Sequence, residues 1–167
     1  MKPKLRVGLL FGGKSVEHEI SIRSAKNVYQ QMDRSRFDPV LIGITKNGHW
    51  YLLNEVDQPI DSGIALNLCL NDSSHTFIGA DGSKGTGILD IVFPVLHGTD
   101  GEDGSIQGML QAIDLPFAGS GVLGSSVAMD KLMSKQLLVK EGIPTSKFQA
   151  VLPGDDLDYD FLVAQVG

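Results

Sequence analysis

Residues 5–15 read LRVGLLFGGKS, a nearly continuous apolar run that ends in two glycines. A short run of this kind is typical of a strand that is buried on both faces of a parallel sheet, and Gly-Gly is typical of a turn. We therefore predict a buried strand from Leu5 to Phe11. Apolar residues then recur at nearly helical spacing between Glu17 and Met32, which predicts a helix directly after the turn.

The alternation of strand and helix continues along the chain. Further strands are predicted at 37–44, 50–53, 76–78, 89–96, 116–117 and 147–152, and further helices at 104–113, 129–141 and 157–166. Residues 54–87 are polar and Gly-rich and predict a variable excursion. The alternation predicts an α/β fold, with a mostly parallel, doubly wound sheet and helices on both faces. Ligands of such sheets bind at the carboxyl ends of strands, where the loops after Phe11 and Leu96 both lie.

Residues 8–15, GLLFGGKS, also match the phosphate-loop pattern G-x-x-x-x-G-K-[ST]. In a phosphate loop the four variable residues wrap around the phosphate, but three of the four here are large apolar side chains. Exposing them would forgo roughly 1.5–3 kcal/mol of burial for each side chain. We predict instead that the strand runs through Phe11, which leaves a loop too short for a phosphate and disfavours a P-loop NTPase.

The composition limits the classes of protein that fit this chain. Its 167 residues suffice for one domain, or for one domain and part of another. A net charge of −6 disfavours nucleic acid and anionic membranes as partners. The single cysteine, Cys69, allows no internal disulfide and suits a reducing compartment. No run approaches the ~18 apolar residues of a membrane span, so we predict a soluble cytoplasmic protein.

The first loop carries polar groups that have two interpretations. Ser15 can cap the predicted helix, and Glu17 and Glu19 in its first turn complement the helix dipole. Alternatively, a carboxylate at a strand end beside two glycines is well placed to hold an ammonium group. The spacing of Glu17-His18-Glu19 does not suit a metal site, and no metal ligands are predicted.

The second loop lies within FPVLHGTDGEDGSIQGMLQ, residues 93–111. His97 stands at the end of a predicted buried strand, three glycines spaced three residues apart follow it, and Glu102-Asp103 precede a predicted helix. One interpretation is a capped helix start with a hydrogen-bonded histidine. The other is that His97 shares a site with Glu17.

Four segments together resemble the N-terminal portion of D-alanine–D-alanine ligase, a member of the ATP-grasp superfamily. They are FGGKSVEHEIS (11–21), FPVLHGTDGEDGSIQGMLQ (93–111), LPFAGSGVLGSSVAMDKLMSK (115–135) and EGIP (141–144). The resemblance covers nearly the whole chain except 54–87. It implies a Rossmann-like, pre-ATP-grasp substrate domain at 1–128 and the beginning of the ATP-grasp domain at 129–167. On this basis we expect the chain to be a fragment of a longer enzyme, inactive alone.

The resemblance implies ATP-dependent joining of two D-alanines for peptidoglycan synthesis, which gives ADP and phosphate. In that family ATP phosphorylates the carboxylate of the first D-alanine, and the amine of the second attacks the acyl phosphate. Glu17 matches the glutamate that anchors the first ammonium group, and His97 the histidine near the carboxylate and the acyl phosphate. These two are the implied catalytic residues, and they bind substrate together with Ser15 and Gly98.

The nucleotide and metal sites are implied only in part. Lys131 matches a lysine that faces the nucleotide phosphates, and Lys135 has a weaker claim. The ligands of Mg²⁺ are expected in the C-terminal part of the family, beyond this chain. Family members are commonly dimers, so we expect a cytoplasmic homodimer. The second substrate stays open between D-alanine, D-lactate and D-serine, and the alternative function is a non-catalytic amino-acid-binding or interaction module.

Overall fold

A computed structural model describes residues 3–70, 74, 76–155 and 158–166. The chain forms two compact units, Met1–Ser125 and Ser126–Gly167. The division falls close to the domain boundary expected after residue 128. The identity of the two domains as substrate domain and ATP-grasp domain stays a prediction.

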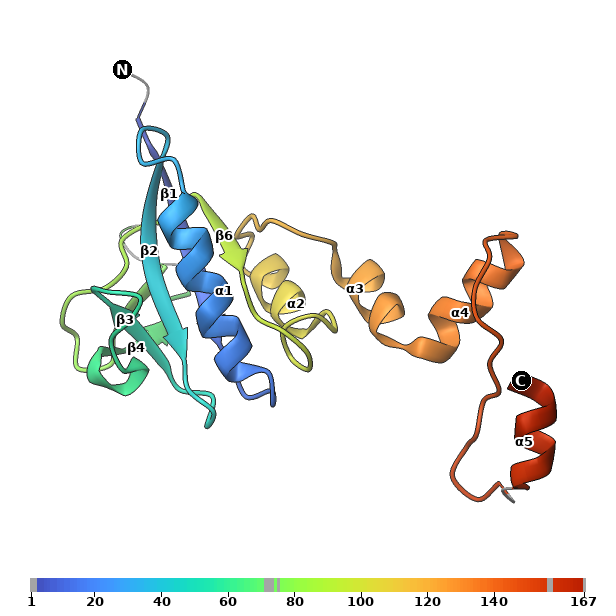
Figure 1. The fold of residues 1–167 in the computed structure, drawn as a ribbon. Helices are drawn as coiled ribbons and strands as arrows, with labels where there is room; N and C mark the ends of the chain where they lie inside the picture. Colours follow the sequence, from blue (N-terminus) through green and yellow to red (C-terminus); the bar gives the residue numbers. More distant parts are fainter. Residues whose placement is uncertain (1–2, 71–73, 75, 156–157, 167) are drawn as a thin grey trace. The chain divides into compact units, whose positions relative to one another are not determined.

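The first unit is built on an open sheet of six strands (Figure 1). Their order in the sheet is β5-β4-β3-β2-β1-β6. The strands are β1 (Leu5–Gly12), β2 (Phe37–Ile44), β3 (Trp50–Leu53), β4 (Ile64–Leu68), β5 (Phe77–Gly79) and β6 (Ile91–Pro94). The helices of this unit are α1 (His18–Gln31), α2 (Ser105–Ala112) and the short 3-10 helix η1 (Ile60–Ser62).

The predicted α/β class is confirmed, with one difference in how the strands pair. Only β2, β1 and β6 are mutually parallel, whereas β3, β4 and β5 are added antiparallel. The expectation of a mostly parallel sheet therefore applies to half of the strands. The tight turn at 46–48, with Gly48 at a φ of +83°, joins β2 to β3 as a hairpin. The five residues between the two strands, 45–49, are too few for a parallel crossover, which needs about a dozen or more.

The strand β1 lies between β2 and β6 and is buried on both faces. Leu9, Leu10 and Phe11 are all fully buried. Because successive side chains of a strand point to opposite faces, Leu9 and Phe11 pack in the core that includes Ala25 of α1. Leu10 packs in the other core, which includes Leu110 of α2. The prediction of helices on both faces is confirmed (Figure 1).

The region 54–87 is more regular than the sequence indicates. It contributes η1, β4 and β5, which extend the sheet by antiparallel pairing. The predicted strand at 76–78 corresponds to β5. The strand expected at 116–117 is a single bridge between Phe117 and Val92.

The regular elements in the C-terminal part of the chain that the structure describes are helices. The helices are α3 (Val122–Met129), which spans the division, α4 (Lys131–Lys140) and α5 (Tyr159–Val166). The sequence analysis missed α3. The predicted helix at 129–141 corresponds to α4, and Asp130 caps α4 by accepting from the amides of Leu132 and Met133 at 2.9 and 3.0 Å.

The strand predicted at 147–152 is wrong, because residues 143–152 form no regular element. The segment has the composition of a strand, yet a strand is stable only when a neighbour satisfies its backbone groups. Within the ranges that the structure describes, no helix combines the length and the apolar composition that crossing a bilayer requires.

Candidate functional site

The site lies where the parallel strands β1 and β6 end side by side. The backbone of Val95 donates to the carbonyl of Leu10 at 2.8 Å, so the two chains stay paired just past the end of β6. The loop of residues 12–17 then leaves β1, and the loop of residues 95–104 leaves β6. From β1 the chain crosses to β2 on one side, while β6 pairs on the other, so the two loops flank a switch point of the sheet.

The phosphate-loop interpretation does not fit the structure. β1 extends through Gly12, as the buried side chains require. The amide of Gly12 donates to the Ser21 hydroxyl, and the amide of Gly13 to the carbonyl of Ile44, both at 2.8 Å. Lys14 forms an ion pair with Asp100, with Nζ and Oδ2 2.8 Å apart. The groups that would bind a phosphate are therefore already bonded within the protein.

Ser15 closes a turn ahead of α1 rather than capping the helix. Its hydroxyl accepts from the amide of Glu17 at 3.0 Å, and its carbonyl accepts from the amide of His18 at 3.2 Å. Glu17 occupies the N-cap position of α1 but makes no side-chain capping bond. Its carboxylate is thus available to the space beyond the helix end.

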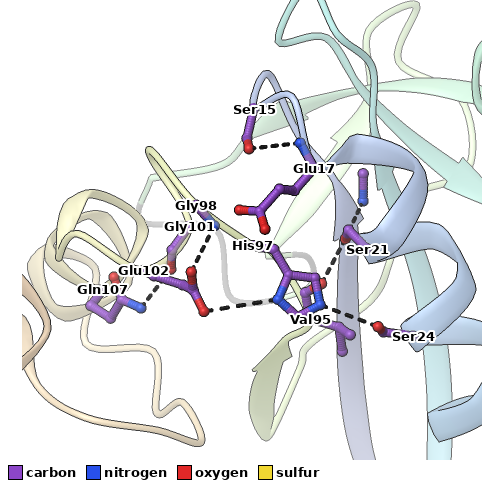
Figure 2. A network of polar contacts seen from close by, with 11 residues as sticks. Ser15, Glu17, Ser21, Ser24, Val95, His97, Gly98, Gly101, Glu102 and Gln107 are labelled. Atoms are coloured by element: carbon purple, nitrogen blue, oxygen red, sulfur yellow. Dashed lines mark hydrogen bonds and ion pairs between the residues drawn. The ribbon is translucent and has the colours of Figure 1, made fainter. Parts of the chain in front are cut away.

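The two loops come into contact at Gly98. A Cβ atom on Gly98 would lie 2.6 Å from Oε2 of Glu17 and 2.7 Å from Oγ of Ser15. The φ of Gly98 is +70°, a conformation that side chains with a Cβ rarely adopt. Glycine is therefore required here on two counts. The structure brings Ser15, Glu17 and Gly98 together, with His97 in the same loop (Figure 2).

His97 is held on both sides of its ring (Figure 2). Its Nε2 lies 3.2 Å from the hydroxyl of Ser24 in α1, and its Nδ1 lies 3.8 Å from Oε1 of Glu102. The other oxygen of Glu102 accepts from the Gly98 amide at 2.7 Å, which fixes the carboxylate beside the ring. The His97 side chain is 32% exposed, so the ring is both oriented and accessible. The sequence analysis missed both partners of the ring.

The loop after His97 is ordered by its own hydrogen bonds. The carboxylate of Asp103 accepts from the amides of Asp100 and Ser105, both at 2.9 Å. Partial burial raises the pKa of Asp103, but the hydrogen bonds from Asp100 and Ser105 outweigh it and leave the pKa below its usual value. The side-chain amide of Gln107 donates to the carbonyl of Gly101 at 2.9 Å. The first interpretation holds only in part: His97 is hydrogen-bonded and Asp103 accepts from the Ser105 amide, but the N-cap of α2 is Gly104, where no side chain makes a capping bond.

Ser21 joins the ends of the two strands that carry these loops. It is completely buried, accepts from the Gly12 amide at 2.8 Å and donates to the Val95 carbonyl at 2.6 Å. The apolar periodicity between Glu17 and Met32 includes Ile20, but Ile20 is 43% exposed and the neighbouring Ser21 faces inward. The spacing from Ser21 to Ala25 is one helical turn, and this spacing could have identified Ser21 as an inward-facing residue.

A cavity of about 380 Å³ opens beside the site. Residues of the loops 12–17 and 95–104 and of the turn at 46–48 line it, including Lys14, Gly48, His97 and Asp100. Its floor is apolar and includes Trp50. Neither Ser15 nor Glu17 belongs to the lining, so the cavity adjoins the Glu17 carboxylate without enclosing it.

The two lysines expected near nucleotide lie in the second unit. Lys131 is exposed at the start of α4. Lys135 donates to the hydroxyl of Ser146 at 2.6 Å and lies over the ring of Phe148. Their roles toward nucleotide stay predictions. In the part of the chain that the structure describes, no three His, Cys, Asp or Glu side chains are grouped to hold a metal ion.

Comparison with known proteins identifies the family of this chain. The family model described as "D-ala D-ala ligase N-terminus" matches residues 6–120, which include both loops of the site. D-alanine–D-alanine ligase A of Escherichia coli is 46% identical over 157 residues, which cover 87% of this chain and 43% of the relative. The chain thus spans less than half the length of that relative.

Solved structures of D-alanine-D-alanine ligases resemble this chain in fold. The D-alanine-D-alanine ligase of Coxiella burnetii matches 96% of this chain and 49% of its own, with a TM-score of 0.85 and 33% identity. The D-alanine–D-alanine ligase of Bacillus anthracis complexed with ATP matches 98% of this chain and 43% of its own, with a TM-score of 0.65 and 28% identity. Since the family model covers most of the chain, this protein belongs to the D-alanine–D-alanine ligase N-terminal family.

Proposed function

We propose that this chain supplies the first D-alanine site of an ATP-dependent D-alanine–D-alanine ligase. The reaction joins two D-alanines through an acyl phosphate, releases ADP and phosphate, and provides the dipeptide for peptidoglycan. Membership of the family supports this proposal, as do relatives named as ligases. The site residues are Ser15, Glu17, His97 and Gly98.

The observation that carries the proposal is the position of the Glu17 carboxylate against Gly98, one residue from His97. An amino acid needs an anion for its ammonium group and a hydrogen-bond donor for its carboxylate. Glu17 provides the anion, and the accessible ring of His97, oriented by Ser24 and Glu102, is our candidate for the group near the carboxylate. A hydrogen bond to a charged group contributes about 1.5–3 kcal/mol, and holding the reacting carboxylate in place contributes to the rate.

ATP, when bound, supplies the phosphoryl group that activates the carboxylate. The relative solved with ATP supports its use as a substrate. The residues at 12–15 do not fit a nucleotide, because the amides of Gly12 and Gly13 and the Lys14 ammonium are bonded internally. Lys131 is our candidate for a phosphate contact, since its exposed position at the start of α4 leaves the ammonium accessible. The described residues do not fit Mg²⁺, so we assign no step to this ion.

The remaining proposals concern the setting of the enzyme. We propose an ATP-grasp enzyme that works in the cytoplasm as a homodimer, uses Mg²⁺ bound outside this segment, and has no nucleic acid or membrane partner. The negative net charge supports the absence of a nucleic acid or membrane partner, and the single cysteine supports a reducing compartment. D-Alanine as the second substrate follows the names of the relatives.

The test is a chimera in which this chain replaces the aligned segment of the Escherichia coli ligase A. We expect phosphate release that requires both ATP and D-alanine. The variant Glu17→Gln should raise the KM for D-alanine about 10- to 150-fold, which corresponds to the loss of one charged hydrogen bond. Glu19→Gln is the matched control, because Glu19 is an exposed glutamate that pairs with Lys46 at 3.0 Å. A folded chimera without activity, or equal kinetics for Glu17→Gln and the parent, would refute the proposal.

A further inference from the structure

Lys14 is the residue that the phosphate-loop pattern singles out, and the proposed site gives it no role. Its ammonium lies 2.8 Å from Oδ2 of Asp100, in the loop that also carries His97. Its aliphatic stem lies against the β2–β3 turn, where a Cβ on Gly48 would be 3.2 Å from Cδ of Lys14. Lys14 therefore contacts both of the segments that surround its own loop.

Asp100 is itself firmly placed. Its φ is +66°, in the left-handed region that non-glycine residues seldom occupy, and its amide donates to Asp103 at 2.9 Å. Asp100 lies two residues after Gly98, and Lys14 lies three residues before Glu17. The ion pair thus links the two loops close to the point where Gly98 meets Glu17.

We propose that Lys14 and Asp100 are positioning residues, and that their ion pair holds the loop of residues 95–104 against the loop of residues 12–17. Ser21 joins the strand ends below the site, and the ion pair joins the loops themselves. The hydrogen bond and charge of Asp100 also raise the pKa of Lys14, which keeps the ammonium form. The structural part of this proposal is independent of the reaction, and its consequence for substrate affinity rests on the proposed function.

The structural part is tested on this chain by amide hydrogen exchange measured with NMR. Lys14→Met and Asp100→Asn should each speed the exchange of the amides of Gly98 and Glu102 about 2- to 5-fold, the range expected for an exposed ion pair. Asparagine is chosen because it tolerates a positive φ. The double variant should exchange no faster than either single variant, since both remove the same interaction.

The control is Lys26→Met, which removes an ion pair of similar exposure. Lys26 pairs with Asp57 at 2.7 Å, outside the two loops of the site. This variant should leave the exchange of the Gly98 amide unchanged. Unchanged exchange in both Lys14→Met and Asp100→Asn, or strictly additive effects in the double variant, would overturn the proposal.

Kinetics of the chimera then separate positioning from direct binding. If the pair positions the loops, Lys14→Met and Asp100→Asn raise the KM for D-alanine by a similar factor of about 2 to 5 and leave kcat nearly unchanged. If instead Lys14 binds substrate, Asp100→Asn releases its ammonium and the affinity is kept or improved, which would overturn the positioning role. A chimera in which exchange responds but no variant has ligase activity would contradict the proposed function, not the link between the loops.

Discussion

Replacing Ser21 with alanine tests whether one buried hydroxyl holds the site together. The substitution removes two hydrogen bonds, of 2.8 Å from the Gly12 amide and 2.6 Å to the Val95 carbonyl. Both partners are then left unpaired in the interior. A buried polar group without a partner costs about 1–3 kcal/mol, and partial relaxation of the two loops lowers the sum. We expect the free energy of unfolding of the first unit to fall by about 2–4 kcal/mol.

Urea unfolding followed by tryptophan fluorescence measures this loss. The chain has one tryptophan, Trp50, which stacks on Phe77 with the ring centroids 5.3 Å apart. Both rings belong to the core of the first unit, so the signal reports that unit alone. With a slope of about 2 kcal/mol per molar urea, the midpoint should fall by about 1–2 M at an unchanged slope.

Ser24→Ala is the matched control for this experiment. Ser24 lies one turn further along α1 and makes a single contact, to Nε2 of His97 at 3.2 Å. Because this contact is partly exposed, its removal should cost less than about 1 kcal/mol. A Ser21→Ala protein within about 0.5 kcal/mol of the parent, or equal losses for the two variants, would refute the reasoning.

Two further predictions concern the loop that carries His97. Gly98→Ala should lower the free energy of unfolding more than Gly82→Ala. Both residues have a positive φ, at +70° and +78°, but only a Cβ at position 98 meets Glu17 and Ser15. Urea unfolding of both variants measures the difference, and equal losses would show that the contact with Glu17 is unimportant. The second prediction uses the lowered pKa of Asp103, whose stabilising effect is present above the unfolded pKa of about 3.9 and is lost as the pH falls through the lower folded value. Below about pH 4 the stability of the parent should therefore fall more steeply than that of Asp103→Asn, and parallel pH profiles would contradict this cause.

The sequence predicts the central part of the fold because the signals there are local. The apolar run of β1 acts within a few residues, and the strand it predicts is confirmed; the strands predicted at 37–44 and 50–53 are also present as β2 and β3. The pairing of β4 and β5 joins segments with weak periodicity, and only their contact in space creates the order. The opposite holds at 147–152, where the residues have strand propensity but no neighbouring strand pairs with them.

In the candidate site, too, local sequence predicts some residues, whereas the contacts between distant segments could not be predicted. Glu17 and His97 could be proposed as site residues because they lie in loops that follow predicted strands and match motifs of the family. Their surroundings could not, since Ser24 reaches His97 from α1, and the contact with Glu102 depends on how the loop of residues 95–104 folds back on itself. Ser21 is polar and so lies outside a search for apolar periodicity, although its burial is complete.

The position of β1 between β2 and β6 affects the order in which the sheet can form during folding. One edge of β1 pairs with β2, about 30 residues later, but the other edge waits for β6, more than 80 residues later. During synthesis the N-terminal segments emerge first, so β1 presents an unpaired apolar edge until β6 arrives. Such an edge is a template for association with other chains. The same late pairing brings the loop of His97 beside the loop of Glu17, so the step that covers this edge also assembles the candidate site.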